Sequence, residues 1–177
     1  LENADRPFVA VLGGAKIADA FMMMQTVLSG GVADKVLTGG LVANILLAAK
    51  GEEIGQGSMN FIIKSNYQEY IEKAKGIYEQ YADKIILPTD LAYTENGQRL
   101  ECDLGSVPEH ITALDIGSKT AEVYQQIIRD AKTVFVNGPV HFESVDSSNL
   151  TYRISGKLGR DTAEILAELG YDQEKID

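Results

Sequence analysis

The stretch Arg6–Ala20, RPFVAVLGGAKIADA, joins a short apolar run to two glycines and a lysine. Apolar runs of this length, rich in valine and bounded by turn residues, are typical of strands buried on both faces of a parallel sheet. Gly13 and Gly14 end the run, and Lys16 stands where a helix is expected to begin. By itself a Gly-Gly pair after a strand is more often a tight turn than a ligand loop. The role of Lys16 therefore depends on what the rest of the chain places beside it.

The same pattern of a buried strand followed by a helix recurs along the chain. Four apolar runs are expected to be parallel strands: Phe8–Leu12, Lys35–Leu37, Lys84–Leu87 and Thr133–Val136. Five segments have helical spacing of apolar residues: Asp19–Leu28, Leu41–Ala49, Asn66–Tyr81, Lys119–Arg129 and Thr162–Leu169. This alternation predicts an α/β fold, a three-layer, Rossmann-like parallel sheet with helices on both faces.

One segment departs from the alternation. Asn96-Gly97 is a type I′ hairpin signal, so we expect a small antiparallel excursion over Leu91–Cys102. The chain contains no internal repeat, linker or low-complexity tract, and we expect residues 1–177 to form a single domain. The openings and endings of the sequence, LENADRP and ELGYDQEKID, suggest a piece of a longer protein.

Composition limits the classes of partner. Sixteen basic and 26 acidic residues give a formal net charge of −10, which argues against a nucleic-acid surface or an anionic membrane surface. A single cysteine, Cys102, excludes an intrachain disulfide and a zinc site of several cysteines, and two histidines disfavour a histidine-rich metal site. Since there is no apolar run of membrane-spanning length and no signal-peptide pattern, we expect a cytoplasmic protein.

Small or polar turn residues follow all four predicted strands. These are Gly13-Gly14-Ala15-Lys16, Thr38-Gly39-Gly40, Pro88-Thr89-Asp90 and Asn137-Gly138-Pro139. In an open parallel sheet, ligands bind beyond the carboxyl ends of the strands, where glycines and helix N-termini offer backbone N–H groups to anions. The residues alone thus predict an anion or nucleotide site at this edge, without a reaction type.

Other candidate features have plainer interpretations. Asn-Gly-Pro alone is usually a turn, and Met22–Met24 are more often core residues than cofactor contacts. Cys102, His110 and His141 are expected to be structural or surface residues. Neither a Walker-type GxxxxGK[ST] nor a dinucleotide GxGxxG is present, so the two commonest phosphate loops are excluded as sequence matches.

Taken in order, the turns resemble the C-terminal, nucleotide-binding domain of the phosphoglycerate kinase family. The matching stretches are RPFVAVLGGAKIAD, VLTGGLVANILLAAKG, IILPTDLAY, ALDIGSKTAEVY and VFVNGPV. Each is weak alone, but five in the family's order are specific, and they cover nearly the whole chain. The resemblance implies an enzyme that transfers phosphoryl between 1,3-bisphosphoglycerate and ADP, with Mg-ATP or Mg-ADP bound by this half.

The resemblance also implies roles for individual residues. Lys16 would hold the transferring phosphoryl and the nucleotide phosphates, with Gly14 in the same loop. Asn137 would lie near the phosphates, and Glu143 would accept from the ribose hydroxyls. The adenine pocket walls would be Gly39, Gly40, Leu41, Ala113 and Leu114. At the start of the last helix, Asp161 would hold magnesium, while Gly159 and Thr162 would lie beside the phosphates.

Four departures from the family pattern stand beside these matches. Many members carry a second lysine four residues after the first, where this chain has Ala20. The family's Asn-Gly-Pro-x-Gly-x-Phe-Glu is one residue short here, NGPVHFE, with His141 in or near the glycine position. The glycine run before Asp161 is reduced to SGKLGRDT, and nothing resembles the basic N-terminal domain that binds phosphoglycerate.

Three functions remain open at this point. The first is the nucleotide-binding half of a phosphoglycerate kinase, inactive by itself because closure over both substrates needs two domains. The second, favoured by the departures, is a non-catalytic nucleotide-binding or interaction domain that keeps the fold. The third is an oxidoreductase with a dinucleotide site, which the missing GxGxxG disfavours.

Overall fold

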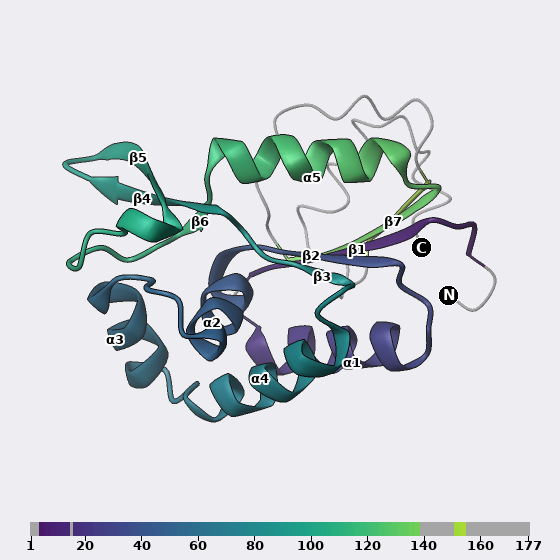
Figure 1. Cartoon of the computed structure of the whole chain (residues 1–177), viewed down its shortest axis with the longest axis horizontal. Coiled ribbons are helices and arrows are strands. Elements are labelled where there is room, and N and C mark those ends of the chain that lie inside the picture. The colour runs from purple at the N-terminus through teal and green to yellow at the C-terminus, as the bar shows by residue number, and fades with distance from the viewer. Residues whose placement is uncertain (1–3, 15, 139–150, 155–177) are drawn as a thin grey trace, which may run out of the picture.

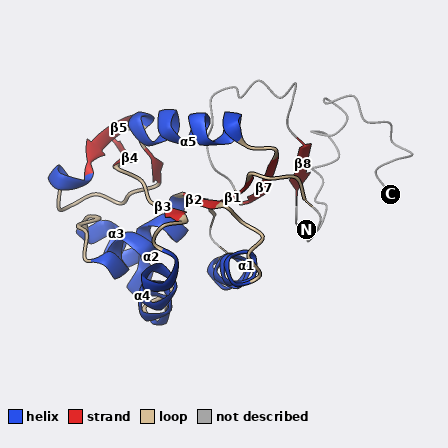
Figure 2. Ribbon diagram, turned by 45° about the vertical axis from the view of Figure 1, so that its right-hand side comes forward, coloured by secondary structure: helices blue, strands red, loops and turns tan. Residues whose placement is uncertain are grey.

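The main element of the fold is a five-stranded parallel sheet (Figures 1 and 2). The structure is a computed structural model that describes residues 4–14, 16–138 and 151–154, the last four by their backbone. The strand order is β3 (Ile85–Ile86), β2 (Lys35–Thr38), β1 (Phe8–Leu12), β7 (Thr133–Asn137) and β8 (Thr151–Ile154). All four pairings are parallel, so the carboxyl ends of the strands lie at one edge.

β1 lies in the middle of the sheet and is buried on both faces. Because side chains alternate along a strand, Phe8, Ala10 and Leu12 pack into one core, and Val9 and Val11 pack into the other. All five residues are at most 1% exposed. This double burial explains why the run is uniformly apolar.

Helices cover both faces of the sheet, as Figure 1 shows. On one face lie α1 (Ile17–Ser29), α2 (Gly40–Lys50), α3 (Gln56–Lys64) and α4 (Glu69–Tyr81). On the other lies α5 (Ser118–Asp130), whose Tyr124 and Ile128 pack on Val9 and Val11. The predicted three-layer α/β architecture is confirmed.

The antiparallel excursion is also confirmed. β4 (Asp90–Glu95) pairs with β5 (Gln98–Asp103), and Asn96 and Gly97 between them have φ of 51° and 74°, as a type I′ turn requires. β6 (Asp115–Ile116) pairs with the other side of β4 to complete a three-stranded sheet, and a short 3₁₀ helix, η1, spans Leu104–Ser106. The segment 107–114 joins η1 to β6 and has no regular secondary structure.

Several predicted bounds were wrong. The sequence predicts four parallel strands, but β8 adds a fifth; its residues, TYRI, lack an apolar run. The helix expected over Asn66–Tyr81 begins at Glu69, because Asn66 has a left-handed φ of 57°. α3 was not predicted: its only buried residues are Ser58 and Ile62, which is too weak a pattern to recognise. The strand expected over Lys84–Leu87 is limited to Ile85–Ile86, and the helix expected over Thr162–Leu169 lies outside the described residues.

In the part of the chain that the structure describes, none of the helices combines the length and apolar character needed to cross a bilayer.

Candidate functional site

The carboxyl ends of β1, β2 and β7 lie side by side. Leu12, the last residue of β1, pairs with Thr38 of β2 on one side and with Asn137 of β7 on the other. The chain leaves β1 through α1 toward β2, and later returns over α5 to the opposite side of β1. The gap between β1 and β7 is therefore a topological switch point, the usual position of a ligand site in an open α/β sheet.

The loops that follow these strands are in direct contact. Gly13 N donates a hydrogen bond to Asn137 O (2.9 Å), and Gly39 N donates to Leu12 O (3.0 Å). Gly138 has a φ of +92°, and a Cβ built on it would lie 2.2 Å from Gly13 O. A side chain at position 138 would thus separate the two loops, so a glycine is required there.

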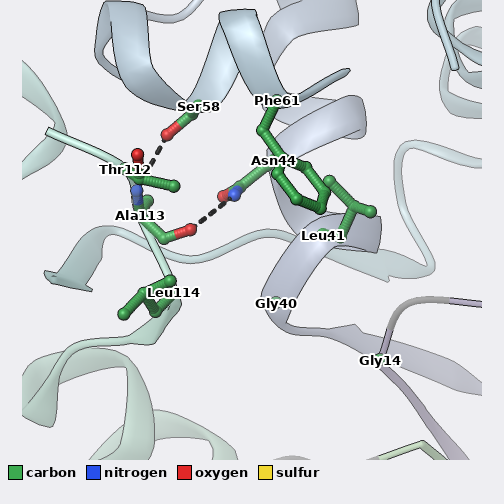
Figure 3. Close-up of a pocket in the computed structure, with 9 residues that line it drawn as sticks. All are labelled: Gly14, Gly40, Leu41, Asn44, Ser58, Phe61, Thr112, Ala113 and Leu114. Carbon is green, nitrogen blue, oxygen red and sulfur yellow. Dashed lines mark hydrogen bonds between the residues drawn. The ribbon is translucent and has the colours of Figure 1, made fainter. Parts of the chain in front are cut away.

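A cavity of about 270 Å³ opens beside these loops (Figure 3). It lies between the N-terminal part of α2, the α3 helix and the segment that precedes β6. Its lining residues are Gly14, Gly40, Leu41, Asn44, Ser58, Phe61, Thr112, Ala113 and Leu114. None of them is charged, and the exposed side chains of Phe61 and Leu114 add apolar surface. Such a cavity suits a flat, uncharged ring.

The two buried polar side chains in the lining are already engaged with the protein. Asn44 Nδ2 donates to Ala113 O (2.9 Å), and Ser58 Oγ accepts from Ala113 N (2.8 Å), as Figure 3 shows. Asn44 is 4% exposed and Ser58 is 1% exposed. Both bonds hold the backbone of the cavity wall.

Lys16 lies at the same edge of the sheet and outside the cavity lining. It is the residue before α1, is exposed, and its carbonyl accepts from Ala20 N (3.0 Å). Within residues 4–14, 16–138 and 151–154 its ammonium group makes no hydrogen bond or ion pair. Gly14, two residues earlier, lines the cavity, so a ligand that fills the cavity and extends along this edge would approach Lys16.

The cavity brings together five of the residues singled out from the sequence: Gly14, Gly40, Leu41, Ala113 and Leu114. Gly39 and Asn137 lie in the adjoining strand ends, where their backbone groups bond to β1 and its loop. The remaining candidates, Glu143, Gly159, Asp161 and Thr162, fall outside the described residues, as does His141. For these, the roles implied by the resemblance remain predictions.

Four lining residues were missed in the sequence: Asn44, Ser58, Phe61 and Thr112. A signal existed for Asn44, because it is the single polar residue within the apolar run LVANILLAA. Ser58 and Phe61 belong to the unrecognised α3, where their spacing of three residues places them on one face. Thr112 carried no signal.

Ala20, at the position of the family's second lysine, is 2% exposed and packs in the core under the sheet. It therefore makes no contact with a ligand at this edge. Of the methionines expected in the core, Met24 is buried there and Met23 is partly buried against it, but Met22 is 65% exposed, so the core expectation was wrong for Met22.

A second hollow, of about 470 Å³, lies between the β4–β5 hairpin and α5. Its polar groups satisfy one another: Arg99 pairs with Glu101 and donates to Ile116 O (2.9 Å), and Glu101 accepts from the hydroxyl of Ser118 (2.6 Å). These bonds lower the pKa of Glu101 to about 2, chiefly through the Ser118 hydroxyl and backbone N–H. The arrangement caps α5, and Glu122 and Gln125 of that helix also line the hollow.

Two other titratable residues considered in the sequence, Cys102 and His110, have surroundings typical of structural or surface residues. Burial raises the pKa of Cys102, which makes it a poor nucleophile. His110 is exposed and pairs with Glu95 (2.7 Å). Among the described residues, no group of three or more histidine, cysteine, aspartate or glutamate side chains could hold a metal ion.

Comparison with known proteins identifies a family. The family model described as phosphoglycerate kinase matches residues 1–167. The chain is 36% identical over 176 residues to the phosphoglycerate kinase of Thermoplasma volcanium, covering 98% of this chain and 43% of that protein. It is 44% identical over 149 residues to that of Methanothermobacter thermautotrophicus, covering 84% of this chain and 36% of that protein.

Two solved phosphoglycerate kinase structures are also similar to this chain. The phosphoglycerate kinase of Pyrococcus horikoshii OT3 superimposes with a TM-score of 0.73 at 37% identity, over 78% of this chain and 35% of that one. The enzyme of Coxiella burnetii has a TM-score of 0.74 at 23% identity, over 96% and 46%, and supports the fold alone. The chain thus spans less than half the length of these relatives. On the family match and these identities, the chain belongs to the phosphoglycerate kinase family.

Proposed function

We propose that this chain is the nucleotide-binding half of a phosphoglycerate kinase. The whole enzyme would transfer phosphoryl between 1,3-bisphosphoglycerate and ADP, giving 3-phosphoglycerate and ATP in glycolysis, and the reverse in gluconeogenesis, in the cytoplasm. Residues 1–177 would form one domain, and phosphoglycerate would bind to an N-terminal domain outside this chain. The observation that carries the proposal is the uncharged cavity beside the carboxyl ends of β1 and β2, lined by Gly40, Leu41, Ala113 and Leu114.

The cavity suits the base of an adenine nucleotide. Its volume of about 270 Å³ is close to the lower end of small-molecule pockets, which favours a single planar base over a complete nucleotide. Phe61 and Leu114, 48% and 58% exposed, would lose water-accessible apolar surface when the base enters. The ribose and phosphates would then extend along the edge of the sheet.

The phosphates would meet positive charge on that edge. The N-termini of α1 and α2 both begin there, after Lys16 and Gly39, and helix N-termini favour anions. Lys16 adds a full charge where a loose phosphoryl-transfer transition state spreads negative charge over three oxygens. We carry over from the family the remaining roles: Asn137 near the phosphates, Glu143 on the ribose, Gly159 and Thr162 beside the phosphates, and Asp161 on the magnesium of the Mg-nucleotide substrate.

Calorimetry of the folded chain with ADP, ATP, AMP and adenosine, in the presence of Mg²⁺, tests the proposal. We expect weak binding of the nucleotides. In Lys16→Ala the affinity for ADP and ATP should fall about 10-fold or more, because a charge-assisted contact to phosphate is lost, while adenosine binds as before. Lys75→Ala, an exposed lysine on α4, makes the same change of net charge away from the edge and should leave all affinities unchanged.

Two results would count against the proposal. If the folded chain bound none of the four ligands, the nucleotide site would be disproved. If Lys16→Ala weakened adenosine as much as ADP, the lysine would act on the loop conformation and not on the phosphates.

A second candidate is a nucleotide-binding domain without catalytic function. The buried Ala20 in place of a phosphate-binding lysine favours it. The intact gene product distinguishes the two: an upstream domain with clustered arginines and histidines, together with phosphoryl transfer, supports the kinase. The oxidoreductase alternative has no support in the family match.

A further inference from the structure

The wall of the cavity is an irregular segment that is held by side chains. Thr112, Ala113 and Leu114 belong to neither a helix nor a strand. Leu114 N donates to Ala92 O of β4 (2.8 Å), which attaches the segment to the small sheet. The Ala113 N–H and carbonyl are instead bonded to Ser58 Oγ (2.8 Å) and Asn44 Nδ2 (2.9 Å). The two side chains come from different helices, α3 and α2, and hold one residue from both of its backbone polar groups (Figure 3).

All three residues of this clamp (Asn44, Ser58 and Ala113) are buried, with at most 4% exposed. Loss of one partner would leave a backbone group of Ala113 without its protein hydrogen bond. The segment would then have to move toward solvent or toward the cavity to find a new partner. The position of the cavity wall, Thr112–Leu114, therefore depends on the side chains of Asn44 and Ser58.

The N-terminus of α3 is seated tightly on the same segment. Gln56 N donates to Glu109 O (2.6 Å) and Ser58 N donates to Ile111 O (3.2 Å). A Cβ on Gly57 would lie 2.4 Å from Thr112 Oγ1 and 2.5 Å from Ile111 O, so the helix approaches as closely as a glycine allows. Because α3 also carries Phe61, one helix both locks the wall and supplies an aromatic side of the cavity.

The opposite side of the cavity is the start of α2. A Cβ on Gly40 would lie 3.9 Å from Leu114 O, which shows how near the two sides are. Asn44 is one turn further along the same helix and reaches across to the wall. The bond from Asn44 therefore joins α2 to the wall segment at one end of the cavity.

We infer that Asn44 and Ser58 are positioning residues for the base: by clamping Ala113 they set the width of the cavity and thereby the affinity for the base of the nucleotide. The inference rests on the proposed function, since it assumes that a base occupies this cavity. It assigns Asn44 and Ser58 no contact with the phosphates and no part in the transfer step.

The test compares base-containing and base-free ligands on Ser58→Ala and Asn44→Ala in the whole 177-residue chain. Binding of AMP and ADP is measured by calorimetry, and binding of inorganic tripolyphosphate by NMR titration. We expect each variant to bind AMP and ADP about 5- to 10-fold more weakly and tripolyphosphate unchanged, because a displaced wall affects only the base. Ile128→Val trims a methyl group from the core on the other face of the sheet and controls for general loss of stability, with all affinities unchanged.

The outcomes separate the inference from the proposed function. Unchanged AMP affinity in both variants, with ADP still bound by the original chain, overturns the inference alone. Equal weakening of AMP and tripolyphosphate also overturns it, because the effect would then be global. If the original chain binds no nucleotide, the proposed function and the inference fall together. If Ser58→Ala does not fold, Asn44→Ala, which acts from a different helix, decides the matter by the same criteria.

Discussion

At the scale of single residues, two carboxylates accept hydrogen bonds from the backbone at the start of α5. Asp90 is 2% exposed and accepts from the backbone N–H groups of Lys119 and Thr120, each at 2.9 Å. Asp90 thus provides acceptors for two N–H groups in the first turn of α5, which have no partner within the helix. Glu101 does the same for Ser118 from the hairpin side, where water still reaches it. The two together fix α5 to the small sheet.

The lowered pKa of Glu101 predicts that the free energy of unfolding depends on pH. Its pKa is lowered from 4.5 to about 2, first because the Ser118 hydroxyl donates to it and then because the Ser118 N–H does. A carboxyl group with a lowered pKa stabilises the fold above about pH 4.5, and this contribution is lost as the pH falls toward 2. Glu101→Gln should therefore reduce the free energy of unfolding at pH 7 by no more than about 1 kcal/mol, since solvent screens the group.

Urea unfolding of the original chain and of Glu101→Gln between pH 7 and pH 3 checks this prediction. The difference in the free energy of unfolding should narrow as the pH falls, while Glu79→Gln, the same change of charge at an exposed position on α4, should show no such trend. A constant difference across this range would contradict the prediction.

At the scale of elements, α5 stabilises strands of the main sheet through one side chain. Tyr124 is 0% exposed, and its hydroxyl lies 2.8 Å from Thr38 O and 2.9 Å from Ile86 O while accepting from Thr38 N (3.3 Å). Burial raises the pKa of Tyr124, so the hydroxyl stays protonated and keeps its donor. The bonds lie at the ends of β2 and β3, immediately before the glycines that begin α2.

Tyr124→Phe should lower the free energy of unfolding by about 1–2 kcal/mol, because the hydroxyl is removed without a cavity and buried backbone groups lose their partner. Urea unfolding measures the change. Tyr81→Phe is the matched control, since the Tyr81 hydroxyl has no hydrogen-bond partner among the described residues. Equal stability of the two variants would show that the Tyr124 hydroxyl contributes nothing.

At the scale of the whole molecule, the sheet presents its ligand edge to one side of a three-layer domain. The cavity and Lys16 lie on that edge. Phosphoryl transfer requires the acceptor to be held in line with the nucleotide and water to be excluded. The chain covers 35–46% of the lengths of the relatives cited above, and we propose that the second substrate site lies in the part of the protein outside this chain.

We therefore expect the 177-residue chain to bind nucleotide without turnover. A coupled assay with 1,3-bisphosphoglycerate and Mg-ADP should give ATP at the rate of the protein-free background. The intact gene product, assayed in parallel, is the positive control. Formation of ATP by the chain alone would show that it carries a complete active site.

The accuracy of the sequence predictions followed the strength of the local signal. β1, β2 and β7 were found because strands buried on both faces must be apolar throughout. The hairpin was found because only a few residue pairs adopt the type I′ turn. α3 and β8 were missed because one is largely exposed and the other carries polar residues, so neither shows the expected periodicity.

For the site, glycines and a lysine after the strands pointed to the edge beside which the cavity lies, and the family resemblance selected five of the nine residues that line the cavity. Asn44 and Ser58 could not be paired with Ala113 from sequence. They are separated from it by 69 and 55 residues, and their bonds exist only because α2 and α3 pack beside the wall.

By itself, the sequence determined the α/β class and the family and predicted a ligand site at one edge of the sheet, because these depend on short-range patterns: apolar runs, turn residues and their order. The tertiary structure alone decided the shape of the cavity, the clamp on Ala113 and the burial of Ala20. These depend on contacts between segments far apart in the chain, and such contacts exist only once both cores on either side of β1 have formed.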